Sequence, residues 1–380
     1  MRRARIGQIL RAALVAACLG MQPSLALDPS HALGQYGHDS WRIEQGLPQD
    51  TVEAIAQTAD GYLWVGTQRG LARFDGVGFT LFSPGNPAAL RSGAIDSLLA
   101  DPDGSLWITT DGGGLLRYRD GTLSSVAPPG LPARLRSLLG DPGGSLWIGT
   151  NQGGLFRLKG GSAVPAGSPA LAHSTVTALG RDRDGSLWIG TDAGLAQLAG
   201  GRLRRLTTRD GLPDDHVSGI LRDSRGQLWI ATARGLALLR GSLSGGRIAV
   251  PAVPGLGDDE ILALLEDRDG NLWIGTRRGL GRLRDGRFES VPAAEDLGSD
   301  AIQALFEDRE GSLWIGTGSG GLHRLKDVAF TGIGRADGLS GFPARAVYED
   351  GRGRIWIGGD GGLDLLSEGR AAPFPGLPEL

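Results

Sequence analysis

One short motif recurs along the chain and limits what the chain can fold into. Eight tryptophans follow a leucine or isoleucine and begin an apolar stretch such as LWIGT at 272–276, and successive copies lie 40 to 44 residues apart. These tryptophans are Trp64, Trp107, Trp147, Trp188, Trp229, Trp273, Trp314 and Trp356. A period of this length predicts a repeat architecture in which each unit is one supersecondary motif.

Glycines divide each unit at three fixed places. One glycine lies three residues before each tryptophan, often in an Asp-Gly pair such as Asp269-Gly270, and two further glycine pairs follow. Asp-Gly between apolar runs predicts a hairpin with a type I′ turn, in which both central residues have positive φ. In the sixth unit the predicted strands are about 260–266, 271–276, 280–284 and 287–291.

Four short antiparallel strands repeated every 40 to 45 residues are typical of β-propeller blades. The predicted fold is therefore all-β. The glycine and proline content of every unit excludes a helical solenoid, and the period is too long for a leucine-rich repeat. Small residues near the start of each first strand would let these strands approach one another around an axis. They are Ala54, Ser97, Ser137, Ala178, Gly219, Ala263, Ala304 and Ala346.

The aspartate six residues before the tryptophan could suggest a calcium loop or a catalytic acid. Counted from Asp267, glycine comes fourth and Arg278 twelfth, which does not match the helix–loop–helix calcium pattern. An active site is normally single, whereas this aspartate occurs in seven of the eight units; the first unit has Thr58 instead. We therefore predict that it accepts backbone N–H bonds at a turn. The tryptophan is predicted to pack between blades, and the threonine three residues later to bond a strand end.

The N-terminus has the pattern of an export signal. A basic segment containing Arg2, Arg3 and Arg5 precedes a short apolar run, and Ser24-Leu25-Ala26 fits a cleavage site. We predict a signal peptide over 1–26 and a periplasmic mature chain without a membrane span; lipoprotein processing at Cys18 is the alternative. The net charge of −3 gives no reason to expect a nucleic-acid partner. No cofactor, metal site or catalytic residue is predicted.

The repeat resembles the two-component-regulator propeller, through the pattern GLP…V-x-A-I…D-x-x-G-x-L-W-I-G-T-x-x-G-L-x-R seen at 46–74 and 211–239. The resemblance implies the periplasmic sensor region of bacterial hybrid histidine kinases or diguanylate cyclases. It also implies seven-bladed propellers, and we expect an output domain missing from this truncated chain and a homodimer formed through a missing C-terminal part.

On this basis we predict a seven-bladed propeller over 27–335, closed by an outer strand at 41–43. Residues 336–380 would begin a second propeller with one blade. Asp327-Val328, in place of the usual Asp-Gly, favours a break near this point. One closed eight-bladed ring is the alternative.

The leading functional hypothesis is a sensor that binds a glycan or another small polar ligand on one face of the ring. The alternatives are an extracytoplasmic protein-interaction scaffold and, less favoured, a propeller glycosidase or lyase. The loops of the predicted binding face carry Gln68, Arg69, Asp111, Asn151, Gln152, Asp192, Asp215, His216, Arg277 and Arg278.

Overall fold

The computed structural model describes residues 26–29, 31, 33–83, 90–240, 247–249, 253, 255–292, 301–328, 333–334, 338–341, 343–352, 354–367 and 370–374. The predicted signal peptide and Cys18 therefore lie outside the described residues, apart from Ala26. Within these ranges the regular structure is strands and four short 3-10 turns, η1 (Leu33–Gln35), η2 (Ile43–Gln45), η3 (Pro169–Leu171) and η4 (Thr208–Asp210). No described helix is long and apolar enough to cross a bilayer.

The strands form eight four-stranded antiparallel sheets, numbered here in chain order. Sheets 1 to 3 are β2 (Val52–Gln57), β3 (Leu63–Thr67), β4 (Gly70–Phe74), β5 (Phe79–Phe82); β6 (Ile95–Ala100), β7 (Leu106–Thr110), β8 (Gly114–Arg119), β9 (Thr122–Val126); and β10 (Leu135–Gly140), β11 (Leu146–Thr150), β12 (Leu155–Lys159), β13 (Ser162–Ala166). Sheets 4 to 6 are β14 (Val176–Arg181), β15 (Leu187–Thr191), β16 (Gly194–Ala199), β17 (Arg202–Leu206); β18 (Val217–Arg222), β19 (Leu228–Thr232), β20 (Gly235–Arg240), β21 (Arg247–Ala249); and β22 (Ile261–Glu266), β23 (Leu272–Thr276), β24 (Gly279–Arg284), β25 (Arg287–Pro292).

Sheet 7 contains the strand nearest the N-terminus. Its order is β1 (Gly37–Trp41), β28 (Leu322–Lys326), β27 (Leu313–Thr317) and β26 (Ile302–Glu307). Sheet 8 is β29 (Ala344–Glu349), β30 (Ile355–Gly359), β31 (Gly362–Ser367) and β32 (Arg370–Pro373). The prediction placed the added outer strand at 41–43, whereas the structure has it at Gly37–Trp41, and Ile43–Gln45 form a 3-10 turn.

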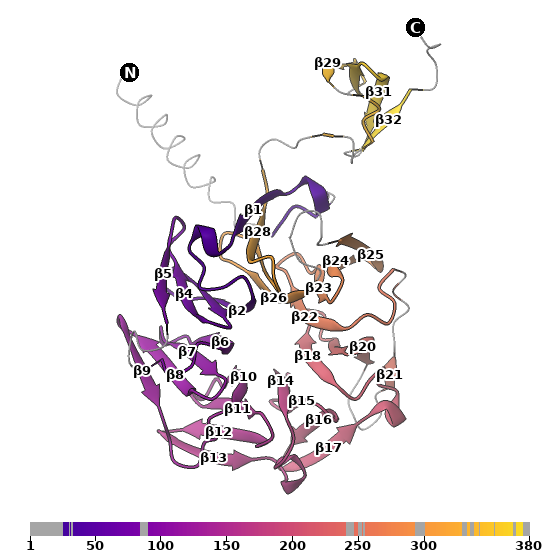
Figure 1. Ribbon diagram of the computed structural model, residues 1–380. Coiled ribbons are helices and arrows are strands. Elements are labelled where there is room, and N and C mark those ends of the chain that lie inside the picture. Colours follow the sequence, from indigo (N-terminus) through magenta and orange to yellow (C-terminus); the bar gives the residue numbers. More distant parts are fainter. Residues whose placement is uncertain are drawn as a thin grey trace, which may run out of the picture. The chain divides into compact units, whose positions relative to one another are not determined.

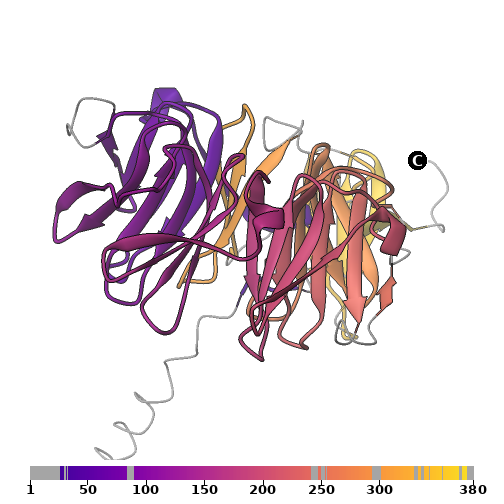
Figure 2. The same cartoon turned by 90° about the horizontal axis from the view of Figure 1, so that it is seen from below.

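The chain divides into two compact units, one comprising 1–27 and 38–325 and the other 28–37 and 326–380. In the first unit, the first strands of sheets 1 to 7 contact one another in turn, and β26 contacts β2. Figure 1 shows these first strands innermost, with the other strands of each sheet outside them. Figure 2 shows the same sheets from another side. Seven sheets thus complete the cycle of contacts, and the predicted all-β architecture of four-stranded blades is confirmed.

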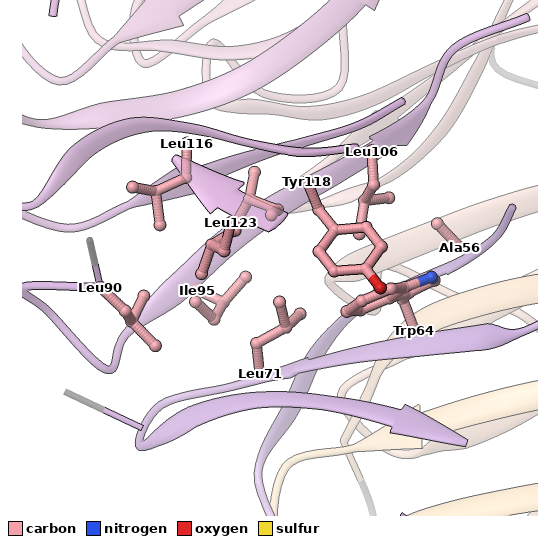
Figure 3. Close-up of a cluster of buried hydrophobic side chains, with 10 residues drawn as sticks. Ala56, Trp64, Leu71, Leu90, Ile95, Leu106, Leu116, Tyr118 and Leu123 are labelled. Carbon is pink, nitrogen blue, oxygen red and sulfur yellow. The ribbon is translucent and has the colours of Figure 1, made fainter. Parts of the chain in front are cut away.

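The core lies between neighbouring sheets. Between sheets 1 and 2, Trp64 is fully buried and its ring centroid lies 4.5 Å from that of Tyr118. Figure 3 shows both rings, with Leu71 and Leu106 among the apolar side chains that surround them. Buried and partly buried residues alternate along β2, because successive side chains of a strand point to opposite faces of the sheet. Val52, Ala54 and Ala56 are the buried ones.

The predicted turn type is wrong for the first hairpin of sheets 1 to 7. There the N–H of Gly270 donates to the carbonyl of Asp267, and the N–H of Asp267 donates to the carbonyl of Asn271. Gly270 has φ 78°, but Asp269 is not among the residues with positive φ. This is a three-residue loop with one left-handed glycine rather than a type I′ turn. The type I′ prediction holds for some third hairpins, such as Asp285-Gly286 with φ 46° and 80°.

Candidate functional site

The loops predicted to bind ligand all lie at the same ends of the strands. In sheets 1 to 4 and 6 they are the turns between the second and third strands, and in sheet 5 they precede β18. Antiparallel order places the start of a first strand beside the end of the second, and backbone bonds such as Arg277 N to Glu260 O join the two segments. We call these strand ends the turn face.

Several predicted residues on the turn face already have polar partners in their own sheet or in the next. Gln68 Nε2 donates to Glu53 Oε1 in the same sheet over 3.0 Å, and Asp111 of sheet 2 forms an ion pair with Arg134 of sheet 3 at 3.5 Å. Arg277 pairs with Glu260 at 2.6 Å, and this carboxylate raises the pKa of the guanidinium. These contacts hold the turns against the first strand of their own sheet or of the next, and the three side chains remain exposed.

Two predicted residues meet across a sheet boundary. The hydroxyl of Thr175 donates to Asn151 Oδ1 over 3.2 Å, and its N–H donates to Asp192 Oδ1 over 3.3 Å. Asn151 belongs to sheet 3 and Asp192 to sheet 4, so Thr175 links the two turns. Beside Asn151, Gln152 has φ 60° and forms the tight part of its turn.

Other predicted residues serve the backbone instead. Asp215 Oδ1 accepts the N–H of Thr208 over 2.6 Å at the start of η4, and the N–H of His216 donates to Asp214 Oδ1 over 2.8 Å. The backbone N–H of Arg69 donates to the hydroxyl of Thr67. Asp215 and the backbone of Arg69 therefore stabilise the conformation of their turns.

In the part of the chain that the structure describes, no group of three or more His, Cys, Asp or Glu residues is placed to hold a metal ion.

The predictions from the sequence did not include the side chains at the second position of each first strand. This position follows the start of a β-bulge, where the register of the first strand shifts against the second in every sheet. It differs strongly between sheets: Glu53, Asp96, Arg136, Thr177, Ser218, Leu262 and Gln303 in sheets 1 to 7. The variation at one repeated position could have identified these residues, because framework positions of the motif stay nearly constant.

Asp96 has the most unusual environment of this group. Burial raises the pKa of its carboxyl to about 7; Arg136 opposes this shift, while Asp111 and Glu53 add to it. Its Oδ2 atom is buried and has no hydrogen-bond partner. At neutral pH the carboxyl therefore exists in both protonated and ionised forms, and it can donate or accept a hydrogen bond.

Comparisons with known proteins agree with this architecture. The family model described as "Two component regulator propeller" matches residues 46–69, 89–112, 170–193, 211–234, 255–278 and 296–319. A comparison with functionally curated proteins gives no match.

Among solved structures, the extracellular domain of a putative hybrid two component system of B. thetaiotaomicron matches with a TM-score of 0.75 and 24% identity. The match covers 89% of this chain and 49% of that one. The extracellular domain of a second such system matches with a TM-score of 0.66 and 20% identity, over 90% of this chain and 54% of that one. This chain thus spans about half the length of both.

Virginiamycin B lyase from Staphylococcus aureus is also similar, with a TM-score of 0.62 and 15% identity, over 77% of this chain and 100% of that one. At these identities the structural matches establish the propeller fold alone. The chain contains six segments that match the two component regulator propeller repeat.

Proposed function

We propose that this chain is the extracytoplasmic sensing region of a two-component or cyclic-dinucleotide signalling protein. The observation that carries the proposal is the six-fold match to the two component regulator propeller model. The extracellular domains of putative hybrid two component systems, which share its fold, give further support. An output domain outside this sequence would convert ligand binding into a signal.

We place ligand binding on the turn face, around the first strands of sheets 1 to 3. Glu53, Asp96 and Arg136 occupy the same repeat position in these neighbouring sheets, and Asp111 acts electrostatically on Asp96. Carboxyl, amide and guanidinium groups in one area suit a ligand with many hydroxyl groups, because each group can exchange hydrogen bonds with a hydroxyl. A glycan is therefore the proposed ligand class.

The test is calorimetric titration of the exported chain with cellohexaose, maltohexaose and a galacturonate hexamer. Saturable binding of one of them, weakened by Asp96→Ala but not by Arg202→Gln, would support the proposal, because Arg202 lies at the opposite strand ends. Binding unaffected by Asp96→Ala would place the ligand elsewhere. No binding, together with capture of one defined protein partner, would favour the scaffold alternative. Turnover of a chromogenic glycoside that one substitution abolishes would favour the enzyme alternative.

A further inference from the structure

A cavity of about 280 Å³ lies between sheets 5 and 6, away from the turn face. One wall is the indole of Trp229 with Leu238 from the neighbouring strand, and the opposite wall includes Leu283 of sheet 6. Gly270 and Asp285, which belong to hairpins at the strand ends opposite the turn face, also line it.

In most sheets an arginine of the chain covers the equivalent tryptophan. The residue paired across the sheet with this tryptophan is arginine in sheets 1, 2, 3, 6 and 7. Its guanidinium carbon lies 5.1 to 5.9 Å from the centroid of the tryptophan ring. The pairs are Arg73–Trp64, Arg117–Trp107, Arg157–Trp147, Arg282–Trp273 and Arg324–Trp314. Attraction between a cation and the face of an indole stabilises this arrangement.

The same arginines bond polar groups around the tryptophan. Arg117 donates to Ser105 Oγ over 2.8 Å and to Asp103 over 2.6 Å. Arg73 reaches the next sheet and donates to the hydroxyl of Tyr118 over 3.1 Å. The positions of Ser105 and Tyr118 in their repeats correspond to Gln227 and Leu283, both of which line the cavity.

Sheet 5 lacks an arginine at this position. Leu238 is paired with Trp229 instead, and none of the arginines whose side chains the structure describes lies over the Trp229 ring. Sheet 4 also lacks the arginine and has Gln197 in its place. Gln197 donates to Ser186 Oγ over 2.9 Å, which is equivalent to the bond from Arg117 to Ser105 in sheet 2. Leucine is shorter than arginine and has no polar end, so the space over Trp229 remains open.

Acidic side chains dominate the charged lining of the cavity. Asp223, Glu266 and Asp285 contribute carboxylates, whereas Arg225 is the one basic residue among the lining residues described. Asp223 Oδ2 accepts the Trp229 Nε1–H bond over 2.9 Å, which fixes the indole beside a negative charge. In sheet 3 the corresponding carboxylate, Asp141, accepts a bond from the arginine itself over 2.8 Å.

We propose that the cavity at Trp229 binds a small organic cation bearing a guanidinium group. The guanidinium would lie on the indole near Asp223, in the place that the chain's own arginine takes in five other sheets. An aromatic face, nearby carboxylates and a cavity of this volume form a cation site. This site is separate from the proposed glycan site and does not depend on the proposed sensing function.

Calorimetric titration of the whole chain with agmatine, a small molecule that carries a guanidinium, tests the proposal. We expect saturable binding to the wild type. Leu238→Arg should weaken binding by about tenfold or more, because a tethered guanidinium then occupies the indole face. The matched variant Gln197→Arg adds the same side chain to sheet 4 and should leave agmatine binding unchanged.

A second variant keeps the test decisive if Leu238→Arg does not fold. Arg225 is exposed, so Arg225→Gln should fold normally and should tighten agmatine binding by removing a like charge. The proposal is overturned if the wild type gives no saturable heat, if a folded Leu238→Arg protein binds as the wild type does, or if Arg225→Gln weakens binding.

Discussion

Asp141 and Trp147 do not bond to each other, although the equivalent aspartate and tryptophan do so in six other sheets. In sheet 6, for example, Trp273 Nε1 donates to Asp267 Oδ2 over 2.8 Å. In sheet 3 the Asp141 carboxylate instead pairs with Arg157 at 2.8 Å and Arg181 at 3.3 Å, and Trp147 Nε1 is buried without a partner. One repeated residue pair thus has two different bonding states in one chain.

This difference predicts unequal effects of the same substitution. Trp273→Phe removes one of several donors from a buried carboxylate, which keeps its bonds from Asn271, whereas Trp147→Phe removes an N–H that has no partner. We expect Trp273→Phe to lower the free energy of unfolding by about 1.5–3 kcal/mol more than Trp147→Phe does, the net contribution of one hydrogen bond to a charged group. Urea unfolding followed by circular dichroism measures both. Equal losses would show that the indole–carboxylate bond contributes no net stability.

The raised pKa of Asp96 predicts a pH-dependent stability. The folded-state pKa of about 7 lies above the usual value of 3.8, so the folded protein holds a proton that the unfolded chain releases between these values. Stability contributed by this carboxyl is therefore complete below about pH 4 and is lost as pH rises through 7. Asp96→Asn should be more stable than the wild type by about 2 kcal/mol at pH 8, after allowing for partial solvent screening, with less difference at pH 4. Urea unfolding of both proteins at each pH tests this, and a gap that does not change with pH would contradict it.

Gly275 is predicted to tolerate no side chain. A Cβ there would lie 2.8 Å from Ile302 Cγ2 and 2.9 Å from the Ile302 carbonyl oxygen, in the first strand of the next sheet. Gly275→Ala should lower the free energy of unfolding by about 1–3 kcal/mol, because the two sheets must move apart. Gly78→Ala is the matched control, since a Cβ at Gly78 meets nothing within 4 Å and its φ is not positive. Similar thermal denaturation midpoints for both variants would argue against this close approach.

Sheet 8 should be the first part of the chain to be cleaved by a protease. All six residues of its first strand, Ala344–Glu349, are exposed, with Val347 at 68% and Tyr348 at 65%. In sheet 1 the first strand instead alternates between buried and partly buried residues. Brief trypsin treatment followed by mass spectrometry should show early cuts at Arg345, Arg352 or Arg354, with sheets 1 to 7 retained. Protection of these sites equal to that of sheets 1 to 7 would contradict the prediction.

The sequence was most informative where the repeat is constant. Strand limits predicted for the sixth unit differ from the observed β22 to β25 by one residue at most, because glycines fix the hairpins. The threonine prediction is also confirmed, as in Thr276, whose hydroxyl donates to the carbonyl of Gly279 over 3.1 Å. Repetition of one pattern supplied this accuracy, since each copy repeats the same local constraints.

The sequence was least informative about contacts that depend on bends in the strands. The bond from Trp273 to Asp267 needs the three-residue loop to bring the two side chains together, and an expected type I′ turn does not suggest it. The environment of Asp96 depends on groups from three sheets, including Glu53 and Arg136. Such a cluster requires the ring geometry, which no single repeat contains.

Sheet 7 has a consequence for the order of events during synthesis. Its outer strand β1 comes from residues 37–41, and Asp39 pairs with Arg324, 285 positions further along the chain. The early strand therefore has no partner until the ribosome has made almost the whole ring, and contacts so distant in sequence form slowly. Completion of the ring is therefore among the last steps in the folding of sheets 1 to 7.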